Sequence, residues 1–181
     1  NDRQALDPQA LAQLIRSYGV GMISTTPSRL QAYLYNAAFR QAVKSLDCLL
    51  CGGEKFPAAL LQQLQRLTLA KIYNQYGPSE ATIGVSLKQL NQCRQITAGK
   101  PMPGCQLYVL DQHQQPLPWG LTGDLYLSGV CLARGYDDNP TLTSQCFIDH
   151  PFIYGQKLYR TGDRACWTEE GEIVIAGRSD E

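Results

Sequence analysis

The sequence predicts an α/β fold in which a part with a parallel sheet is followed by a smaller, antiparallel β-rich part, a distorted barrel. Two observations carry this prediction. In the first half, the short apolar strands 20–24 and 46–53 alternate with helical patterns, as they do in parallel sheets. From about Gly99, short alternating strands are separated by turns rich in Pro, Gly, Asp and Asn. We therefore expect an α/β part over 1–98 and a β-rich part over 99–181.

Each element is justified by apolar spacing and by residues that start or stop helices. Residues 7–19 predict a helix with Asp7 and Pro8 as cap and first turn and Gly19 as stop. Proline opens two more predicted helices, which are 27–39 and 57–67. The expected strands are 20–24, 46–53 and 71–77 in the first half and 106–111, 123–129, 157–163 and 171–177 in the second. Ligands bind beyond the carboxyl ends of parallel strands, and the stretches 52–54 (GGE) and 75–81 (QYGPSEA) are expected there.

Composition excludes several classes of function. The chain has 181 residues with 16 basic and 16 acidic side chains and no net charge, so nothing indicates nucleic acid or an anionic membrane as a partner. Its apolar runs are too short to span a bilayer, and its start, which has no Met, lacks the features of a signal peptide. Seven scattered cysteines favour a reducing cytoplasm. We interpret Cys48 and Cys51 as small hydrophobic residues of a strand rather than as a redox or zinc pair.

The loop IYNQYGPSEATIG (72–84) holds more chemistry than packing requires. Tyr76 offers a ring for stacking, and Gly77 followed by proline makes a tight turn. Ser79 can donate to a phosphate oxygen, Glu80 can hold Mg²⁺, and Asn74 can pair with a heterocycle edge. On these residues alone, a nucleotide loop and an ordinary turn with a capping Ser and a solvated Glu are both open.

Two later stretches are weaker on their own. In YRTGD (159–163), Asp163 can accept from two adjacent hydroxyls, as on a ribose, although a β-turn Asp that satisfies its own backbone is the more common case. In GRSD (177–180), Arg178 can reach a sugar or phosphate.

The order of the motifs GGE, NQYGPSEATIG, GKPMPG, GDLYLSG, LARGY, YRTGD and GRSDE resembles the adenylation domains of non-ribosomal peptide synthetases. These domains belong to the acyl-CoA synthetase and luciferase superfamily. The resemblance covers about Leu46 to Glu181. It implies that an amino-acid carboxylate attacks the α-phosphorus of ATP, giving aminoacyl-AMP, and that the acyl group then passes to the phosphopantetheine thiol of a carrier protein, as in the biosynthesis of peptide secondary metabolites.

The resemblance also implies roles for single residues. Ser79 and Glu80 take the catalytic positions, with Ser79 at the α-phosphate and Glu80 as the Mg²⁺ ligand. Asp163 would hold both ribose hydroxyls, and Asp180 would be the hinge to a C-terminal domain. The nucleotide-binding set is Gly52, Gly53, Asn74, Tyr76, Gly77, Ser79, Asp163, Ile175 and Arg178.

The side-chain pocket of the amino acid is implied in the same way. Its residues within this chain are Ser24, Leu50, Gly52, Gln75, Ile83 and Gly84. Two glycines leave room, while Ser24 and Gln75 offer polar groups that an aliphatic substrate would leave unpaired. We expect a medium or large side chain with a polar group. The alternative is that Ser24 and Gln75 bond to the backbone and ignore the substrate.

Some features of the family are not found in this sequence. These are the Gly- and Ser/Thr-rich phosphate loop, the Asp that grips the substrate ammonium, and the C-terminal domain with its catalytic Lys. We therefore expect the rear portion of a larger N-terminal domain, inactive alone and completed by the remaining parts of the adenylation domain. Alternatives are a stand-alone amino-acid or aryl-acid ligase and a non-catalytic scaffold piece.

Overall fold

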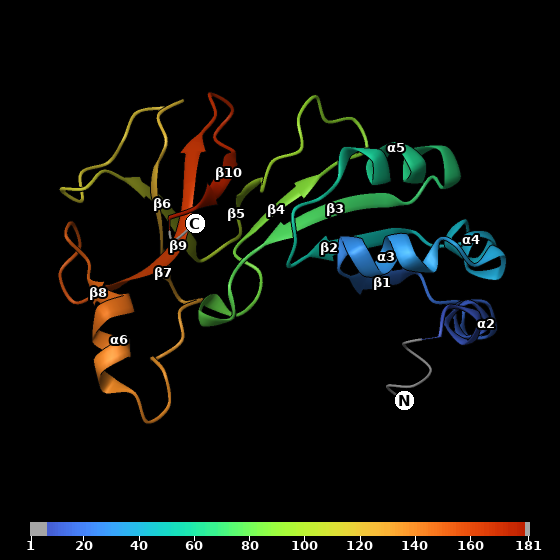
Figure 1. The fold of residues 1–181 in the computed structure, drawn as a ribbon, viewed down its shortest axis with the longest axis horizontal. Helices are drawn as coiled ribbons and strands as arrows, with labels where there is room; N and C mark the ends of the chain where they lie inside the picture. Colours follow the sequence, from blue (N-terminus) through green and yellow to red (C-terminus); the bar gives the residue numbers. More distant parts are fainter. Residues whose placement is uncertain (1–6, 180–181) are drawn as a thin grey trace. The chain divides into compact units, whose positions relative to one another are not determined.

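The structure, a computed structural model, describes residues 7–179. Their contacts form two compact units. The first runs to Asn74 and includes Gln89–Ile96, and the second comprises Gln75–Lys88 and the chain from Thr97 onward. Figure 1 follows the chain from the blue helices of the first unit to the red strands of the second. The contacts thus group residues 75–88 with the later part of the chain, whereas the change in sequence texture lies near Gly99.

The first unit is built from helices and a sheet. Its helices are α2 (Pro8–Tyr18), α3 (Pro27–Tyr33), α4 (Ala37–Val43) and α5 (Ala58–Leu67). Its strands are β1 (Met22–Thr25), β2 (Cys48–Gly52) and β3 (Lys71–Tyr76), although the last two residues of β3 are grouped with the second unit. Strands β1 and β2 pair in parallel, as predicted, and the sheet order begins β1-β2-β3. Helix α2 packs against α4 (Figure 1).

Helix ends account for one confirmed prediction and one error. Asp7 caps α2 by accepting from the Gln9 amide at 2.9 Å, and Gly19 ends it in the left-handed region. The single helix expected over 27–39 is wrong, because the chain breaks between α3 and α4. Asn36 accepts from the Phe39 amide at 3.0 Å and so starts a new helix. Arg40 donates to the Leu34 carbonyl, which lies just beyond α3, at 2.7 Å.

The core of the first unit explains its cysteine pair. The largest fully buried side chains in this core are Ile15, Leu30, Phe39, Leu49, Leu60, Leu64, Ile72 and Leu90. Cys51 is fully buried among them, and burial raises the pKa of its thiol to about 12. The interpretation as small hydrophobic residues is consistent with this placement.

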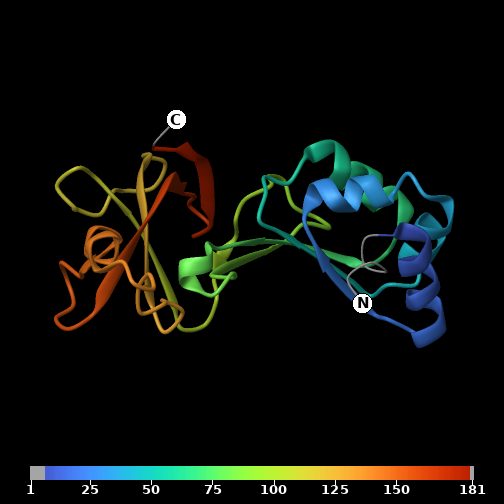
Figure 2. The ribbon, with the colours of Figure 1, turned by 60° about the horizontal axis from the view of Figure 1, so that its bottom comes forward.

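The second unit is mostly antiparallel. After a 3₁₀ turn, η1 (Ser79–Ala81), its elements are β4 (Ser86–Gln89), β5 (Lys100–Pro101), β6 (Cys105–Leu110), β7 (Gly123–Gly129), α6 (Pro140–Cys146), β8 (Phe147–Asp149), β9 (Lys157–Trp167) and β10 (Ile173–Arg178). Strands β4 and β5 pair antiparallel. The larger sheet has the order β10-β9-β7-β6, with β8 beside β9. Figure 2 shows it as a curled, open sheet, which corresponds to the distorted barrel expected.

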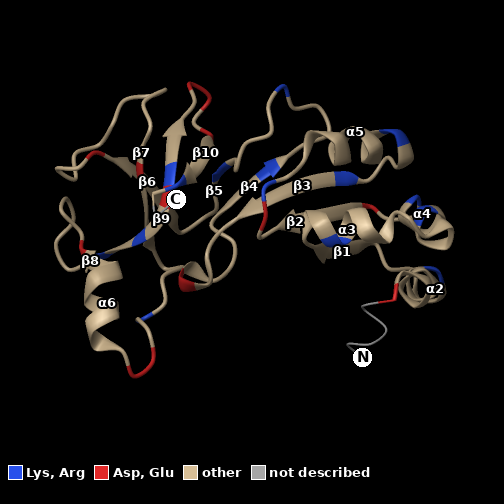
Figure 3. Cartoon of the chain, viewed as in Figure 1, with Lys and Arg blue, Asp and Glu red and all other residues tan. Residues whose placement is uncertain are grey.

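In Figure 3 the Lys and Arg residues (blue) and the Asp and Glu residues (red) are interspersed along the elements of each unit. Over residues 7–179, no helix has the length and apolar character needed to cross a membrane.

Candidate functional site

The loop after β3 closes on itself. The Val85 amide donates to the Tyr76 carbonyl at 2.8 Å, so the chain returns to the strand it left. Thr82 and Ile83 both have positive φ, 58° and 70°. A Cβ at Gly77 would lie 2.4 Å from the Ile83 carbonyl oxygen, so only glycine fits this close approach. The tight turn expected at Gly77 lies instead at Thr82 and Ile83, and Gly77 is needed because the returning chain passes close to its backbone.

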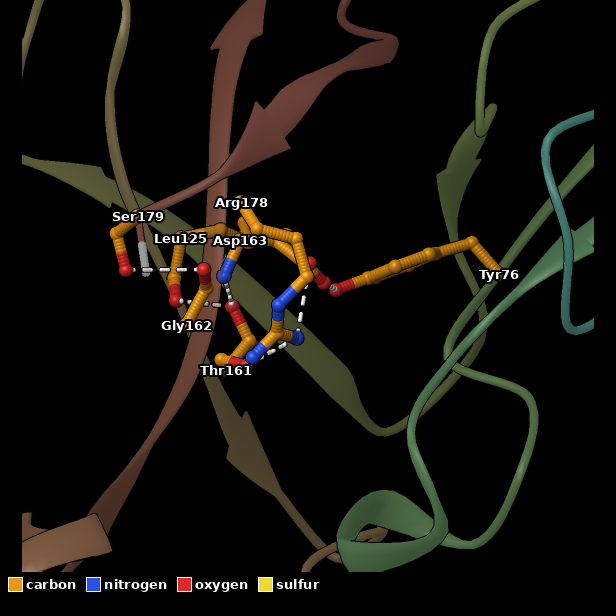
Figure 4. Close-up of polar contacts among 7 residues, drawn as sticks. All are labelled: Tyr76, Leu125, Thr161, Gly162, Asp163, Arg178 and Ser179. Atoms are coloured by element: carbon orange, nitrogen blue, oxygen red, sulfur yellow. Dashed lines mark hydrogen bonds and ion pairs between the residues drawn. The ribbon is translucent and has the colours of Figure 1, made fainter. Parts of the chain in front are cut away.

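Tyr76, the last residue of β3, points toward Asp163 on β9, as Figure 4 shows. Its hydroxyl donates to Asp163 Oδ2 at 2.5 Å. The Asp163 amide donates to Thr161 Oγ1 at 2.9 Å, and Thr161 Oγ1 donates to the Leu125 carbonyl on β7 at 2.8 Å. These bonds fix the backbone of Asp163 against the neighbouring strand.

Arg178 reaches the same carboxylate from β10. Asp163 and Arg178 are partners in the β9–β10 ladder, and Arg178 Nη1 lies 3.4 Å from Asp163 Oδ1. Gly162 has φ of 75°, and a Cβ there would lie 2.8 Å from Arg178 Nη2. The glycine before Asp163 thus leaves the space that the guanidinium occupies.

Burial reinforces the protonated state that a tyrosine already has at pH 7. Burial first, and then the hydrogen bond to Asp163 and its charge, raise the pKa of Tyr76 far above the ordinary value. The phenol is therefore neutral at pH 7 and acts as a donor to the carboxylate.

Glu80 lies in a second polar cluster. Tyr136 donates to Glu80 Oε1 at 2.6 Å, and the Ala133 amide donates to the Glu80 carbonyl at 2.7 Å. Burial raises the pKa of Glu80, but hydrogen bonds from Tyr136, from its own backbone and from Tyr159 outweigh it, so the pKa lies below its ordinary value. Burial, with Glu80 nearby, raises the pKa of Tyr159 to about 12. The Ala133 amide thus fixes the backbone of Glu80, and the phenols of Tyr136 and Tyr159 hold its carboxylate.

The remaining candidates are distributed over both units. The first unit carries Ser24, Leu50, Gly52, Gly53 and Asn74, and the second carries Gln75, Tyr76, Gly77, Ser79, Glu80, Ile83, Gly84, Asp163, Ile175 and Arg178. Asp180 lies outside the described residues.

Exposure differs among these candidates. Ser79 is exposed, and Ile83 is 71% exposed. Ile175 packs against the core of the second unit together with Tyr76. The Gln75 amide lies directly over Gly84, because a Cβ at Gly84 would fall 1.9 Å from Gln75 Nε2.

Sequence reasoning missed the phenols around Glu80. Tyr136 and Tyr159 stand inside the motifs LARGY and YRTGD, but they received no role. The only signal was an aromatic hydroxyl within each motif. Across residues 7–179, no group of three or more His, Cys, Asp or Glu is arranged to hold a metal ion by itself.

Comparison with solved structures defines the class of protein. One similar structure is a fused adenylation–PCP di-domain, NpsA-ThdA from Klebsiella oxytoca. The similarity covers 95% of this chain and 33% of that protein, with a TM-score of 0.84 and 29% sequence identity. The four-domain nonribosomal peptide synthetase AB3403 was solved with AMP and glycine. Its similarity covers 96% of this chain and 13% of that protein, with a TM-score of 0.84 and 31% sequence identity. The fold matches part of the N-terminal subdomain of an adenylation domain.

The sequence comparisons give the family. The model of the AMP-binding enzyme family matches residues 1–137. Enterobactin synthase component F of Escherichia coli O157:H7 is 40% identical over 185 residues, which is 97% of this chain and 14% of that protein. The chain belongs to the AMP-binding enzyme family, within its peptide-synthetase branch, and spans about one seventh of this relative's length.

Proposed function

We propose that the chain is part of an adenylating ligase that forms aminoacyl-AMP from ATP and an amino acid and then loads a carrier-protein phosphopantetheine thiol. The observation that carries the proposal is the cluster of Tyr76, Asp163 and Arg178 in a chain of the AMP-binding family. The carrier partner rests on the resemblance and on the fused adenylation–PCP neighbour. The cytoplasm is the compartment that the unpaired cysteines favour.

The proposed nucleotide roles are those that the family resemblance implies, and the chemistry of the side chains is compatible with them. Asp163 would accept from both ribose hydroxyls, and Tyr76 would stack on adenine while Ile175 covers the other face. Arg178 would contact the ribose region. The adenine pocket would be completed by Gly52, Gly53, Asn74 and Gly77.

The reaction needs charge neutralisation at the phosphates. Ser79 is exposed, which suits a hydroxyl that donates to the α-phosphate. Mg²⁺ is usually held by one or two carboxylates together with phosphate oxygens, and the half-buried Glu80 carboxylate fits that donor set. When bound, the ion supplies positive charge to the phosphates during displacement of pyrophosphate. The chain's own groups would orient ATP and hold the α-phosphorus in line with the attacking carboxylate. Asp180 is proposed as the hinge.

The test is amino-acid-dependent exchange of labelled pyrophosphate into ATP by the complete enzyme. Asp163→Ala should raise the KM for ATP by about tenfold or more, because a ribose contact is made in ground and transition states alike. Glu80→Ala should instead lower kcat by about 10²-fold, because its contribution grows as phosphate charge is redistributed. Asp149→Ala, which removes a 93% exposed carboxylate, is the control. Near-normal kinetics in either site variant would remove that residue from the site.

The substrate pocket is proposed to be lined by Ser24, Leu50, Gly52, Gln75, Ile83 and Gly84. We expect a medium or large amino acid with a polar side-chain group. A panel of all proteinogenic amino acids and several aryl acids, ranked by kcat/KM on the complete enzyme, tests this. A preference for Val, Leu or Ile would contradict the role given to Gln75, and a preference for an aryl acid would favour the aryl-acid ligase. No adenylation with any acid would favour a scaffold.

A further inference from the structure

Both oxygens of the Asp163 carboxylate already accept from protein donors. The Tyr76 hydroxyl donates to Oδ2 at 2.5 Å, and Arg178 Nη1 lies 3.4 Å from Oδ1 (Figure 4). The first distance is that of a charge-assisted O–H···O⁻ bond, whereas the second is long for a hydrogen bond. Tyr76 therefore holds the carboxylate more tightly than Arg178 does.

The carboxylate retains capacity for a further ligand. An ionised carboxylate offers about four lone-pair sites, and within residues 7–179 only Tyr76 and Arg178 donate to this one. About two sites remain, which is the number that a vicinal diol needs. A carboxylate can accept from both hydroxyls of a diol only if its plane is held in one orientation. The terminal torsion of an aspartate side chain is broad, so another group must hold that plane.

The hydrogen bond from Tyr76 is the contact that fixes the terminal torsion of the Asp163 side chain. Thr161 fixes the backbone amide of Asp163 but does not touch its carboxylate. Arg178 is 45% exposed on its side chain and would draw the carboxylate toward itself if the opposing hydroxyl were removed. The neutral phenol of Tyr76, kept protonated by burial and by Asp163, supplies the opposing bond.

We propose that the Tyr76 hydroxyl is a positioning group that orients Asp163 to accept both hydroxyls of a ribose, so that Tyr76 helps to select ribonucleotides over deoxynucleotides. This inference rests on the proposed function of Asp163. The inference gives two parts of Tyr76 different roles. The ring would contact the base, and the hydroxyl would act on the sugar through the Asp163 carboxylate.

The experiment compares dissociation constants for ATP and 2′,3′-dideoxy-ATP, measured by calorimetry on the complete enzyme. The variants are Tyr76→Phe, Asp163→Ala and Tyr76→Ala. Tyr108→Phe is the matched control, because its hydroxyl donates to the Gln106 side chain at 3.0 Å in the same unit. The readout is the preference for ATP, which is the ratio of the two constants. ATP and dideoxy-ATP both bind to the folded fraction of a variant. Partial unfolding therefore weakens both apparent affinities equally and does not change their ratio.

Tyr76→Phe should lower the preference for ATP on the order of tenfold and leave dideoxy-ATP binding within about twofold. Asp163→Ala should lower the preference at least as far, Tyr76→Ala should also weaken dideoxy-ATP binding, and Tyr108→Phe should change neither constant. If Tyr76→Phe keeps the wild-type preference while Asp163→Ala loses it, the inference is overturned and the ribose role of Asp163 stands. If Asp163→Ala also keeps the preference, both are overturned.

Discussion

Two carboxylates of the second unit, Asp163 and Glu80, each accept a hydrogen bond from a tyrosine that is distant in sequence. Tyr76 lies 87 residues from Asp163, and Tyr136 lies 56 residues from Glu80. In both pairs a charged acceptor meets a neutral phenol, which is among the stronger kinds of side-chain hydrogen bond. These pairs fix side chains that motif reading had treated as independent.

At the residue scale, Tyr136→Phe should lower the free energy of unfolding by about 1–2 kcal/mol at pH 7, because it removes a hydrogen bond to a half-buried carboxylate. The folded-state pKa of Glu80 is lowered, so this contribution is present above the unfolded pKa and is lost as the pH falls through the folded one. Urea unfolding at pH 7 and pH 3 measures both effects. Tyr108→Phe, which loses a bond to a neutral amide, should cost less, and an equal cost would contradict the role of the Glu80 charge.

The sequence predicted the acceptors of these pairs better than their donors. Glu80 and Asp163 stand at fixed places in motifs, and their chemistry is evident from residue type. Tyr136 is also in a motif, but its partner depends on how the 129–136 segment folds back on the loop after β3. Hydrogen bonds across such separations come from tertiary structure, which no local pattern encodes.

At the scale of elements, predictions succeeded where apolar spacing was strong and failed where it was weak. Helix α2 and strand β7 were expected at nearly their observed bounds. Helix α6 was not expected, since none of its residues is buried and it shows no apolar stripe. Its start is nevertheless encoded, because Asn139 accepts from the Leu142 amide at 3.0 Å and proline follows.

The turn after β8 depends on one histidine. His150 is 6% exposed, and its Nδ1 accepts from the Phe152 amide at 3.1 Å and the Ile153 amide at 3.2 Å. The neutral ring therefore carries its proton on Nε2, which is buried without a hydrogen-bond partner among the described residues. Burial lowers the pKa of His150. Protonation at Nδ1 would remove the acceptor of both amides.

Stability should therefore fall on acidification. The folded pKa of His150 is depressed, so its contribution is complete above the unfolded value near 6.5 and is lost as the pH falls below that value toward the folded pKa. His150→Asn keeps an acceptor for the turn and should flatten the change in Tm between pH 7.5 and pH 5.5. His113→Asn alters the other histidine, which is exposed, and should leave the slope unchanged. An unaltered slope in His150→Asn would assign the pH dependence to other groups.

At the scale of the whole molecule, each unit has its own core, and both cores contain a buried thiol. Cys51 lies in the first core and Cys131 in the second, and all seven cysteines are free. Burial raises the pKa of Cys51 to about 12 and that of Cys131 to about 11. The other five thiols are half-buried.

In the folded protein, the two buried thiols should react more slowly than the five half-buried ones. At pH 8 both buried thiols stay almost entirely protonated, so Cys51 and Cys131 should react last with a disulfide reagent. Stopped-time labelling with peptide mapping measures the order, and all seven should react promptly in guanidinium. Labelling of Cys51 as early as the half-buried Cys93 or Cys166 would show that the first core opens readily.

The separation of Tyr76 from Asp163 has a consequence for synthesis of the chain on the ribosome. The loop that carries Tyr76 belongs to the second unit, although it precedes most of that unit in sequence. At ~5–20 residues per second, the 87 residues that separate the pair take roughly 4–17 s to translate. During that interval the β3 loop has been made but its carboxylate partner has not. If Asp163 has the ribose role proposed above, a nascent chain arrested before this residue should be unable to retain ATP, however long it is held.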